Sequence, residues 1–514
     1  MKHILKAFII VFFICSHATA QQKLTLGQQQ EDFRIFKTSM QEMHAGVYWF
    51  ITPERFNTLY DSVYKTLKNN EDAEQFYMKV RFCMASLKHG HDGVEWTNRQ
   101  PGINYKMNAM PANRMHLPFV MEYLGSKLYI LNNCSSNNKI TRGTEILSIN
   151  GKTITSLNKQ MLQYVFANGQ NTTFKYKMLG FYFQFHYLYQ MFYPNETSYK
   201  LTVIPYKSKK KIELTVKAEM PNTIAERYQY QTGKSINTWS KLIDYKIIDK
   251  ERRTGYCKLE TFSTGRFDND STKLAWELKK IFDAVKLNGI KSLIVDIRDN
   301  EGGDDIWQTA ITYFREIKEN KNGGLAYLQS DKFTQIQFVI KNDENRQLLQ
   351  VFQNNPYKLI DSTADGRFKL KSEYTDHDTK AKPLMPNAFK GDVYLLQNGL
   401  TFSGGFAFAG TLKNLINESN GFIKIIGEDN GDDMNAGVGS GGWNIELLLP
   451  GSKVKLNIPI TGNGEKAYTI PPVHFLDYKI IPTIADKLNG VDTELEFTKS
   501  LINQKKNSDQ RYHL

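Results

Sequence analysis

The sequence predicts a multidomain protein of the α/β class. Its length of 514 residues suggests about three domains, at roughly 150 residues for each. A helical pattern before residue 90 changes to short strands and turns after residue 110, and strands alternate with helices from about residue 247. We therefore expect an N-terminal helical segment, a small β module, and an α/β core whose mixed sheet is built from strand–helix crossovers.

The first twenty residues are typical of an export signal. Lys2 and Lys6 precede a short apolar run at 9–15, and Ala18-Thr19-Ala20 supplies small residues for cleavage. Because this run is too short to span a bilayer, we expect a signal peptide at 1–20, and no later stretch approaches a membrane span. We expect an exported protein, periplasmic or extracellular. A retained anchor or a lipid on Cys15 would instead hold it at a membrane surface.

Composition and charge narrow the class of protein. Hydrophobic residues make up 41% of the chain and charged residues 23%, which is typical of globular proteins. The net charge of +13 is scattered, apart from a lysine cluster at 207–211 that we interpret as a solvated strand end. No nucleic-acid-binding motif accompanies it, so we expect no nucleic-acid partner. The sequence says nothing about the oligomeric state.

The four cysteines give no framework for disulfides or metal. They are Cys15, Cys83, Cys134 and Cys257, so removal of the signal leaves three without close spacing. An odd, scattered set argues against both a disulfide scaffold and a zinc cluster, and we expect buried thiols. We expect neither a metal nor an organic cofactor.

Hydrophobic spacing and turn signals predict the secondary structure of the N-terminal and middle segments. Apolar residues recur at helical spacing between residues 31 and 88, and a Gly-rich turn ends the segment. Further on, Asn150-Gly151 separates two apolar runs, which is a strong hairpin signal. The aromatic-rich stretch from 172 to 216 predicts further strands of this small β unit.

The core pattern is a series of strands and helices. We expect strands at 255–262, 292–300, 392–398 and 423–429, and helices at 271–289 and 402–419. The strand at 292–300 is almost continuously apolar, which is typical of a strand buried on both faces. We therefore expect a partly parallel sheet.

Ser403 is the best candidate for a nucleophile. It follows a buried strand and lies where a helix begins, so free N–H groups and the helix dipole can stabilise an oxyanion there. The glycines that follow allow a substrate to approach the backbone. The alternative is that Ser403 only caps the helix.

Two further segments could complete such a site. The turn at 296–304 contains Gly302 and Gly303 and could present main-chain N–H groups to an anion, although it could also be an ordinary turn. His91 lies in a Gly-flanked turn and could activate a serine as a base. His89 and His474 compete for that role.

These segments occur in an order that resembles the tail-specific (C-terminal processing) protease family. The resemblance covers nearly the whole chain after the signal, through the segments 43–67, 86–96, 117–154, 255–262, 293–303, 392–405, 422–433 and 475–497. It identifies the segment around 117–154 as a PDZ-like module. The boundaries we expect are 1–20 for the signal peptide, 21–110 for the helical domain, 111–220 for the PDZ-like β region, 221–500 for the protease core and 501–514 for a polar tail.

The resemblance implies roles for particular residues. Ser403 falls on the nucleophile, and the N–H of Gly404 with one from Gly302 or Gly303 falls on the oxyanion hole. Many members use a lysine from the loop after the Gly-Glu strand, but that loop here is Asp429-Asn430-Gly431-Asp432-Asp433. Other branches use a histidine from the N-terminal part, and His91 falls on that position.

The implied function is a serine peptidase that cleaves unstructured peptide or protein tails. An acid could orient His91, with Glu428 and Asp477 as candidates, and the PDZ-like module would bind an extended peptide by strand addition. The alternative is a family member that has lost catalysis and binds peptides or another ligand, because several motif positions differ. A carbohydrate hydrolase has only the acids of the 429–433 loop in its favour.

Overall fold

The computed structural model describes thirteen stretches of the chain. They are residues 22–103, 106–236, 242–318, 327–328, 330, 333–342, 360–362, 368–370, 381–413, 422–432, 436–438, 444–464 and 476–511. The expected signal peptide at 1–20 lies outside them. Within the stretches that are described, no helix has both the length and the apolar character needed to cross a bilayer.

The N-terminal layer is built on three helices. They are α1 (Leu26–Met43), α2 (Pro53–Tyr64) and α3 (Ala73–Ala85), and the short strands β1 (Lys23–Leu24) and β2 (Glu71–Asp72) pair beside them. Thr25 begins α1 with a capping box and Thr52 caps α2, so the N–H groups of Gln28 and Arg55 in the first turns have partners. The helices bury apolar faces against one another, which confirms the predicted helical segment.

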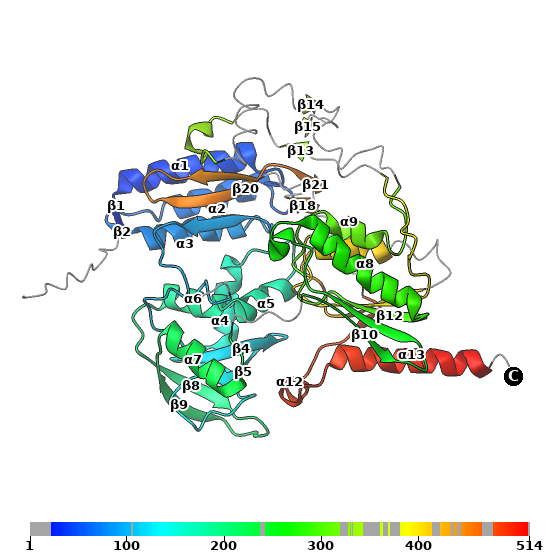
Figure 1. Cartoon of the computed structure of the whole chain (residues 1–514). Coiled ribbons are helices and arrows are strands. Elements are labelled where there is room, and N and C mark those ends of the chain that lie inside the picture. Colours follow the sequence, from blue (N-terminus) through cyan, green and yellow to red (C-terminus); the bar gives the residue numbers. More distant parts are fainter. Residues whose placement is uncertain are drawn as a thin grey trace, which may run out of the picture.

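Two strands from near the C-terminus complete this layer. β20 (Val454–Pro459) pairs on one side with β19 (Asn444–Leu448) and on the other with β3 (Gly93–Trp96), all antiparallel. Figure 1 shows β20, in orange, beside the blue helices. The predicted helical domain at 21–110 therefore shares its core with residues that we assigned to the protease core. Local patterns do not reveal this pairing because the partners are far apart in the sequence.

The β module follows. Its sheet has the order β4-β5-β6-β8-β9, with bounds Phe119–Leu124, Lys127–Asn133, Glu145–Ile149, Ser198–Ile204 and Ile212–Lys217, and β7 (Lys152–Thr153) pairs with β6. The hairpin predicted at Asn150-Gly151 is confirmed, since β6 and β7 pair across it and both residues have positive φ, at 47° and 77°.

The prediction of strands throughout 172–216 is wrong for its first half. Residues Thr173–Phe181 form helix α5 and Gln184–Phe192 form α6, and strands begin only at Ser198. Aromatic residues favour strands, but tertiary packing overrides that preference here, because α6 buries Phe185, Tyr187 and Leu188 in the core. The other helices of this region are α4 (Ile154–Met161) and α7 (Pro221–Thr232).

The α/β core is a mixed sheet, as predicted, and it has six strands. The strand order is β10-β11-β12-β16-β17-β22, with bounds Ile243–Asp249, Thr254–Leu259, Ser292–Asp296, Asp392–Gln397, Ile423–Gly427 and Tyr478–Lys479. Only β10 runs antiparallel to its neighbour in this sheet. The helices α8 (Ser271–Leu287), α9 (Ile306–Ile311) and α11 (Gly404–Lys413) pack on one face, and α13 (Thr493–Arg511) packs on the other (Figure 1).

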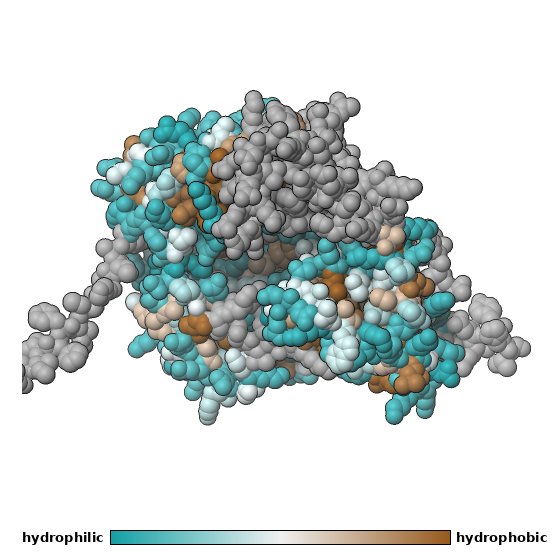
Figure 2. Space-filling model, turned by 45° about the horizontal axis from the view of Figure 1, so that its top comes forward, coloured by the Kyte–Doolittle hydropathy of each residue, from teal (hydrophilic) through white to brown (hydrophobic). Residues whose placement is uncertain are grey.

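The remaining elements are short. The strands β13 (Tyr327–Leu328), β14 (Ile360–Ser362), β15 (Phe368–Leu370), β18 (Ala436–Val438) and β21 (Gly462–Gly464) form a separate sheet. Helix α12 (Ile484–Asn489) precedes α13, which continues to Arg511, so residues 501–511 of the expected polar tail are helical. On the face in Figure 2, hydrophobic residues form small groups among hydrophilic ones, as is normal for a protein surface.

Candidate active site

The carboxyl ends of β12 and β16 bring two turns side by side. Because the strands are neighbours and parallel, residues 297–303 and 398–403 leave the sheet at the same edge. Backbone hydrogen bonds join the turns, from Ile297 N to Leu396 O at 2.9 Å and from Phe402 N to Asn300 O at 2.9 Å. The turns therefore keep a fixed spacing.

Ser403 occupies a sharp strand-to-helix turn. Its φ is +51°, in the left-handed region that residues with a side chain rarely adopt, and this costs about 1–3 kcal/mol that the surrounding contacts have to offset. α11 begins at the next residue, and the Ser403 N–H donates to the Asp432 Oδ2 at 3.2 Å. The side chain remains partly exposed to solvent, as a nucleophile requires.

His91 lies against Ser403. The distance from His91 Nε2 to Ser403 Oγ is 3.1 Å, although the two residues are 312 positions apart. The imidazole packs on the ring of Phe402, with 4.6 Å between centroids. Gly90 makes this approach possible, because a Cβ there would lie 2.6 Å from the Phe402 ring. The structure thus brings together the serine and the histidine singled out in the sequence.

The surroundings of His91 favour its neutral form. Burial lowers the pKa of His91, and the carboxylates of Asp432 and Asp92 oppose this effect. The Nδ1 atom is buried and has no hydrogen-bond partner among the residues described. A neutral imidazole whose Nε2 faces a serine hydroxyl can accept the proton of that hydroxyl.

Asp432 is the site residue that sequence reasoning missed. Its Oδ2 accepts the Ser403 N–H, and its Oδ1 accepts a hydrogen bond from the Asn168 amide. Asn168 is fully buried and also accepts the Gly90 N–H at 2.5 Å. Asp432 belongs to the acidic loop at 429–433, where the family resemblance led us to look for a lysine. The place of this loop in the family pattern was the signal that could have pointed to Asp432.

Gly303 and Gly404 offer two free N–H groups beside the serine. Neither donates to any acceptor in the described residues, and an ideal Cβ on Gly404 would lie 3.5 Å from the Gly303 N. Gly302 does not offer its own N–H, because that group donates to Asn300 Oδ1 at 2.8 Å. It is needed as glycine, since its φ is +94° and a Cβ there would lie 2.5 Å from Gly404 N.

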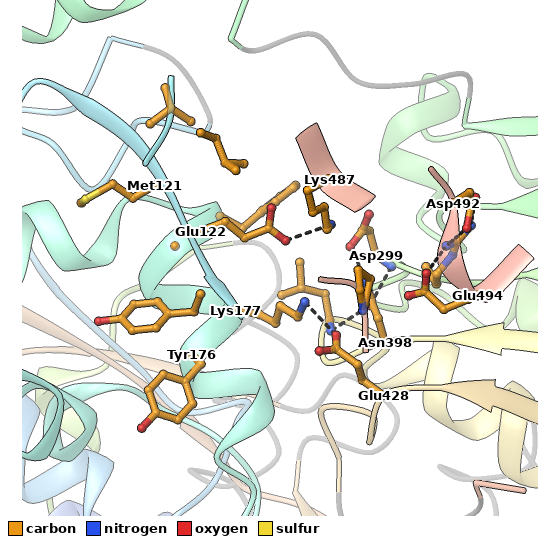
Figure 3. A pocket seen from close by; sticks show the side chains of 18 of the residues that line it. Met121, Glu122, Tyr176, Lys177, Asp299, Asn398, Glu428, Lys487, Asp492 and Glu494 are labelled. Carbon is orange, nitrogen blue, oxygen red and sulfur yellow. Dashed lines mark hydrogen bonds and ion pairs between the residues drawn. The ribbon is translucent and has the colours of Figure 1, made fainter. Parts of the chain in front are cut away.

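The two acids expected to orient His91 are engaged elsewhere. Glu428 pairs with Lys177 at 2.7 Å, and Figure 3 shows these side chains pointing toward one another. Asp477 pairs with Lys413 and Lys424 and accepts the Ile425 N–H. Within the described part of the chain, the structure brings neither carboxylate into contact with His91. The lysines that pair with these two acids come from other parts of the chain, so the sequence around each acid does not reveal the pairing.

His89, the competing histidine that the structure describes, is engaged away from the serine. His89 is fully buried, its Nε2 lies 2.8 Å from Gly46 O, and burial holds its pKa well below the ordinary value. His474 lies outside the described residues. The Cys83, Cys134 and Cys257 thiols are buried and free, as predicted, and burial raises the pKa of Cys134 to about 12.

Comparisons with known proteins agree with this architecture. Residues 253–433, which span β12, β16, Ser403 and Asp432, match the model described as peptidase family S41. No curated protein matches the chain.

Three solved structures share its fold over almost its whole length. The crystal structure of mature CPAF is 14% identical, with a TM-score of 0.58, over 94% of this chain and 98% of that chain. A CPAF mutant is 13% identical with a TM-score of 0.60, over 93% of this chain and 97% of that chain. Mature CPAF complexed with lactacystin is 13% identical with a TM-score of 0.57, over 93% and 98% of the two chains.

Proposed function

Because the chain carries a domain of peptidase family S41, a family of serine-type peptidases, we propose that it cleaves unstructured peptide or protein tails through an acyl-enzyme on Ser403. His91 is the general base. The observation that carries this proposal is the 3.1 Å contact between His91 Nε2 and Ser403 Oγ, which joins two distant segments at the edge of the core sheet.

The first step forms the acyl-enzyme. Ser403 Oγ attacks the scissile carbonyl carbon while its proton passes to His91 Nε2, so a C–O bond forms and the carbonyl oxygen becomes an anion. The N–H groups of Gly303 and Gly404 are free to bind that anion. Collapse of this intermediate breaks the C–N bond, and His91 returns the proton to the leaving amine.

The second step releases the acyl group. A water molecule gives a proton to His91 Nε2 and attacks the ester carbonyl, and the proton then returns to Ser403 Oγ as the C–O bond breaks. Asp432 acts as a positioning residue in both steps. It fixes the backbone of the strained serine through the Ser403 N–H, and its negative charge favours the imidazolium that forms on His91.

The substrate must offer its backbone in an open conformation. The two free N–H groups belong to the backbone of Gly303 and Gly404 beside Ser403, so the scissile carbonyl has to approach these turns closely, which an unstructured segment can do. The export signal expected from the sequence of residues 1–20 supports action in the periplasm or outside the cell.

The test is hydrolysis of a mixed library of unstructured peptides by the mature protein. We expect cleavage by the wild type and a loss of about 10³-fold or more with Ser403→Ala. Equal thermal unfolding of the two proteins would show that the fold is intact. Peptide binding without any cleavage by the wild type would overturn the proposal and leave a binding protein that keeps the fold.

A further inference from the structure

A cavity lies close to the proposed active site. It has a volume of about 300 Å³ and is lined by the N-terminal layer, by α5 and α6 of the β module, and by the turn that carries the oxyanion glycines. Its polar lining residues include Arg81, Glu95, Arg99, Tyr182, Tyr187 and Glu301. We call it the Arg81 cavity.

The Arg81 cavity is within reach of a bound substrate. Glu301 is two positions before Gly303, and Val94 in the lining is three positions after His91. At about 3.5 Å for each residue, the Cα atoms of these lining residues lie within roughly 7 Å and 11 Å of those of Gly303 and His91. An extended peptide advances about 3.3 Å per residue, so a side chain within about three residues of the scissile bond can reach the cavity.

Two arginines of the cavity have no carboxylate partner in the described residues. Arg81 is 8% exposed and donates only to neutral acceptors, namely Tyr164 O at 2.8 Å, Tyr77 Oη at 2.8 Å and Gln184 Oε1 at 3.1 Å. Arg99 donates to the backbone oxygens of Asn108 and Ala109. A buried guanidinium is costly unless an anion compensates it.

Arg298 shows how the same fold treats an arginine with a structural role. Its guanidinium contacts three carboxylates, those of Asp296, Asp492 and Glu494, at 2.6 to 3.2 Å. Arg81 is similarly buried but has none of these contacts. The difference indicates that the positive charge at Arg81 serves a group that is supplied from outside the chain.

The carboxylates of the cavity do not neutralise these arginines. Glu95 pairs with Lys455 at 3.2 Å, and Glu301 accepts a hydrogen bond from the Tyr182 hydroxyl. Neither forms an ion pair with Arg81 or Arg99. The Tyr187 hydroxyl, 3% exposed as a residue, is buried at the cavity without a hydrogen-bond partner in the described residues. It is a further donor for an anion.

We propose that the Arg81 cavity is a substrate subsite for a carboxylate, so that the peptidase selects peptides with Asp or Glu within about three residues of the scissile bond. Two guanidinium groups and a free hydroxyl match the acceptors of a carboxylate. The subsite rests on the proposed function for its place in the reaction, but its binding does not depend on catalysis.

The test measures binding with catalysis removed. In Ser403→Ala protein, we compare the Kd of peptides that contain Asp or Glu with those of matched peptides that contain Asn or Gln. Each peptide is made with a free and with an amidated C-terminus, which separates a side-chain carboxylate from a terminal one. We expect peptides with Asp or Glu to bind about tenfold more tightly than the matched peptides with Asn or Gln, whether the C-terminus is free or amidated.

Variants then assign the preference to the cavity. In the Ser403→Ala background, Arg99→Gln and Arg81→Gln remove one cavity charge each, and Arg34→Gln on the exposed face of α1 removes one elsewhere. We expect the preference to fall severalfold in the first two proteins and to persist in the third. Arg99→Glu should shift selection toward peptides with Lys, a reversal that misfolding would not produce.

The outcomes separate the two proposals. Equal Kd values for acidic and amide peptides would overturn the subsite, even if the wild type cleaves both. A preference that depends only on a free C-terminus would also overturn it, since the carboxylate would then come from the chain end. A preference in Ser403→Ala protein without cleavage by the wild type would support the subsite and reject the peptidase.

Discussion

Ser403 and His91, the proposed nucleophile and base, come from regions that are built in different ways. Ser403 and the oxyanion glycines follow neighbouring parallel strands of one sheet, and short backbone hydrogen bonds join their turns. His91 instead precedes β3, which is held in place by β20 from the other end of the chain. The position of Ser403 is therefore fixed locally within the core sheet. The position of His91 instead depends on how the N-terminal layer packs against that core.

The largest expected effect separates His91 from its buried neighbour. His91→Ala should lower kcat/KM by about 10³-fold and leave unfolding unchanged, because the side chain serves the reaction. His89→Leu should cost about 1 kcal/mol of unfolding free energy, because Gly46 O loses the imidazole and keeps only the Trp49 N–H as a donor, and most of the activity per folded molecule should remain. Peptide hydrolysis and urea unfolding of both variants test this contrast, and a reversed pattern would contradict it.

Glu301, in the turn that carries Gly302 and Gly303, should make the stability of the protein depend on pH. Burial raises the pKa of Glu301 from about 4.5 to about 7, so the folded chain binds this proton more tightly than the unfolded chain does. The resulting stability is fully present below about pH 4.5 and is lost as the pH rises through about 7. Relative to Glu301→Gln, the wild type should lose up to about 3 kcal/mol of unfolding free energy across this window.

Urea unfolding at pH 4.5, 6 and 8 measures this difference. Glu277→Gln on α8 provides the matched control, because that partly exposed glutamate pairs with Lys280 at the surface. Parallel pH curves for the wild type and Glu301→Gln would show that Glu301 has an ordinary pKa.

Asp432 acts on both residues, because it accepts the Ser403 N–H and its charge raises the pKa of His91. Asp432→Asn should lower kcat/KM by about 10- to 100-fold, because the imidazolium loses a stabilising charge. Burial already lowers the pKa of His91 and Asp432 opposes that effect, so the variant should move the acidic limb of the pH–rate profile to lower pH. Asp429→Asn, which affects a surface pair with Lys479, should leave the limb in place.

The smallest expected effect concerns the contact between Gly90 and the ring of Phe402. Gly90→Ala places a methyl group 2.6 Å from the Phe402 ring, so the ring and the imidazole stacked on it must shift. We expect a loss of about tenfold in kcat/KM. Gly27→Ala, where a Cβ meets nothing within 4 Å, should keep full activity, and equal activity of the two variants would show that the interface adapts freely.

The core could be predicted from the sequence because its signals are local. The strands before Ser403 and before Gly302 are short apolar runs that end in glycine-rich turns, and the structure contains both. His91 could be selected only through the family resemblance, since its approach to Ser403 depends on the pairing of β3 with β20. The second oxyanion donor could not be assigned to Gly302 or Gly303, because the Asn300 side chain decides which N–H is occupied.

The missed features have a common physical cause. Asp432, Glu428 and Asp477 are all acids near the end of the core sheet, and only tertiary contacts decide which of them pairs with a lysine and which faces the histidine. The aromatic residues of α5 and α6 likewise have a preference for strands that long-range packing overrides.

The pairing of β3 with β20 also sets the moment during synthesis at which His91 can take its place beside Ser403. The carbonyl of His91 accepts a hydrogen bond from Asn457, which is made 366 residues later. At roughly 5–20 residues per second, the ribosome adds that residue about 20 to 70 s after His91. A chain still in synthesis therefore cannot complete the proposed Ser403–His91 pair in this way until Asn457 has been added.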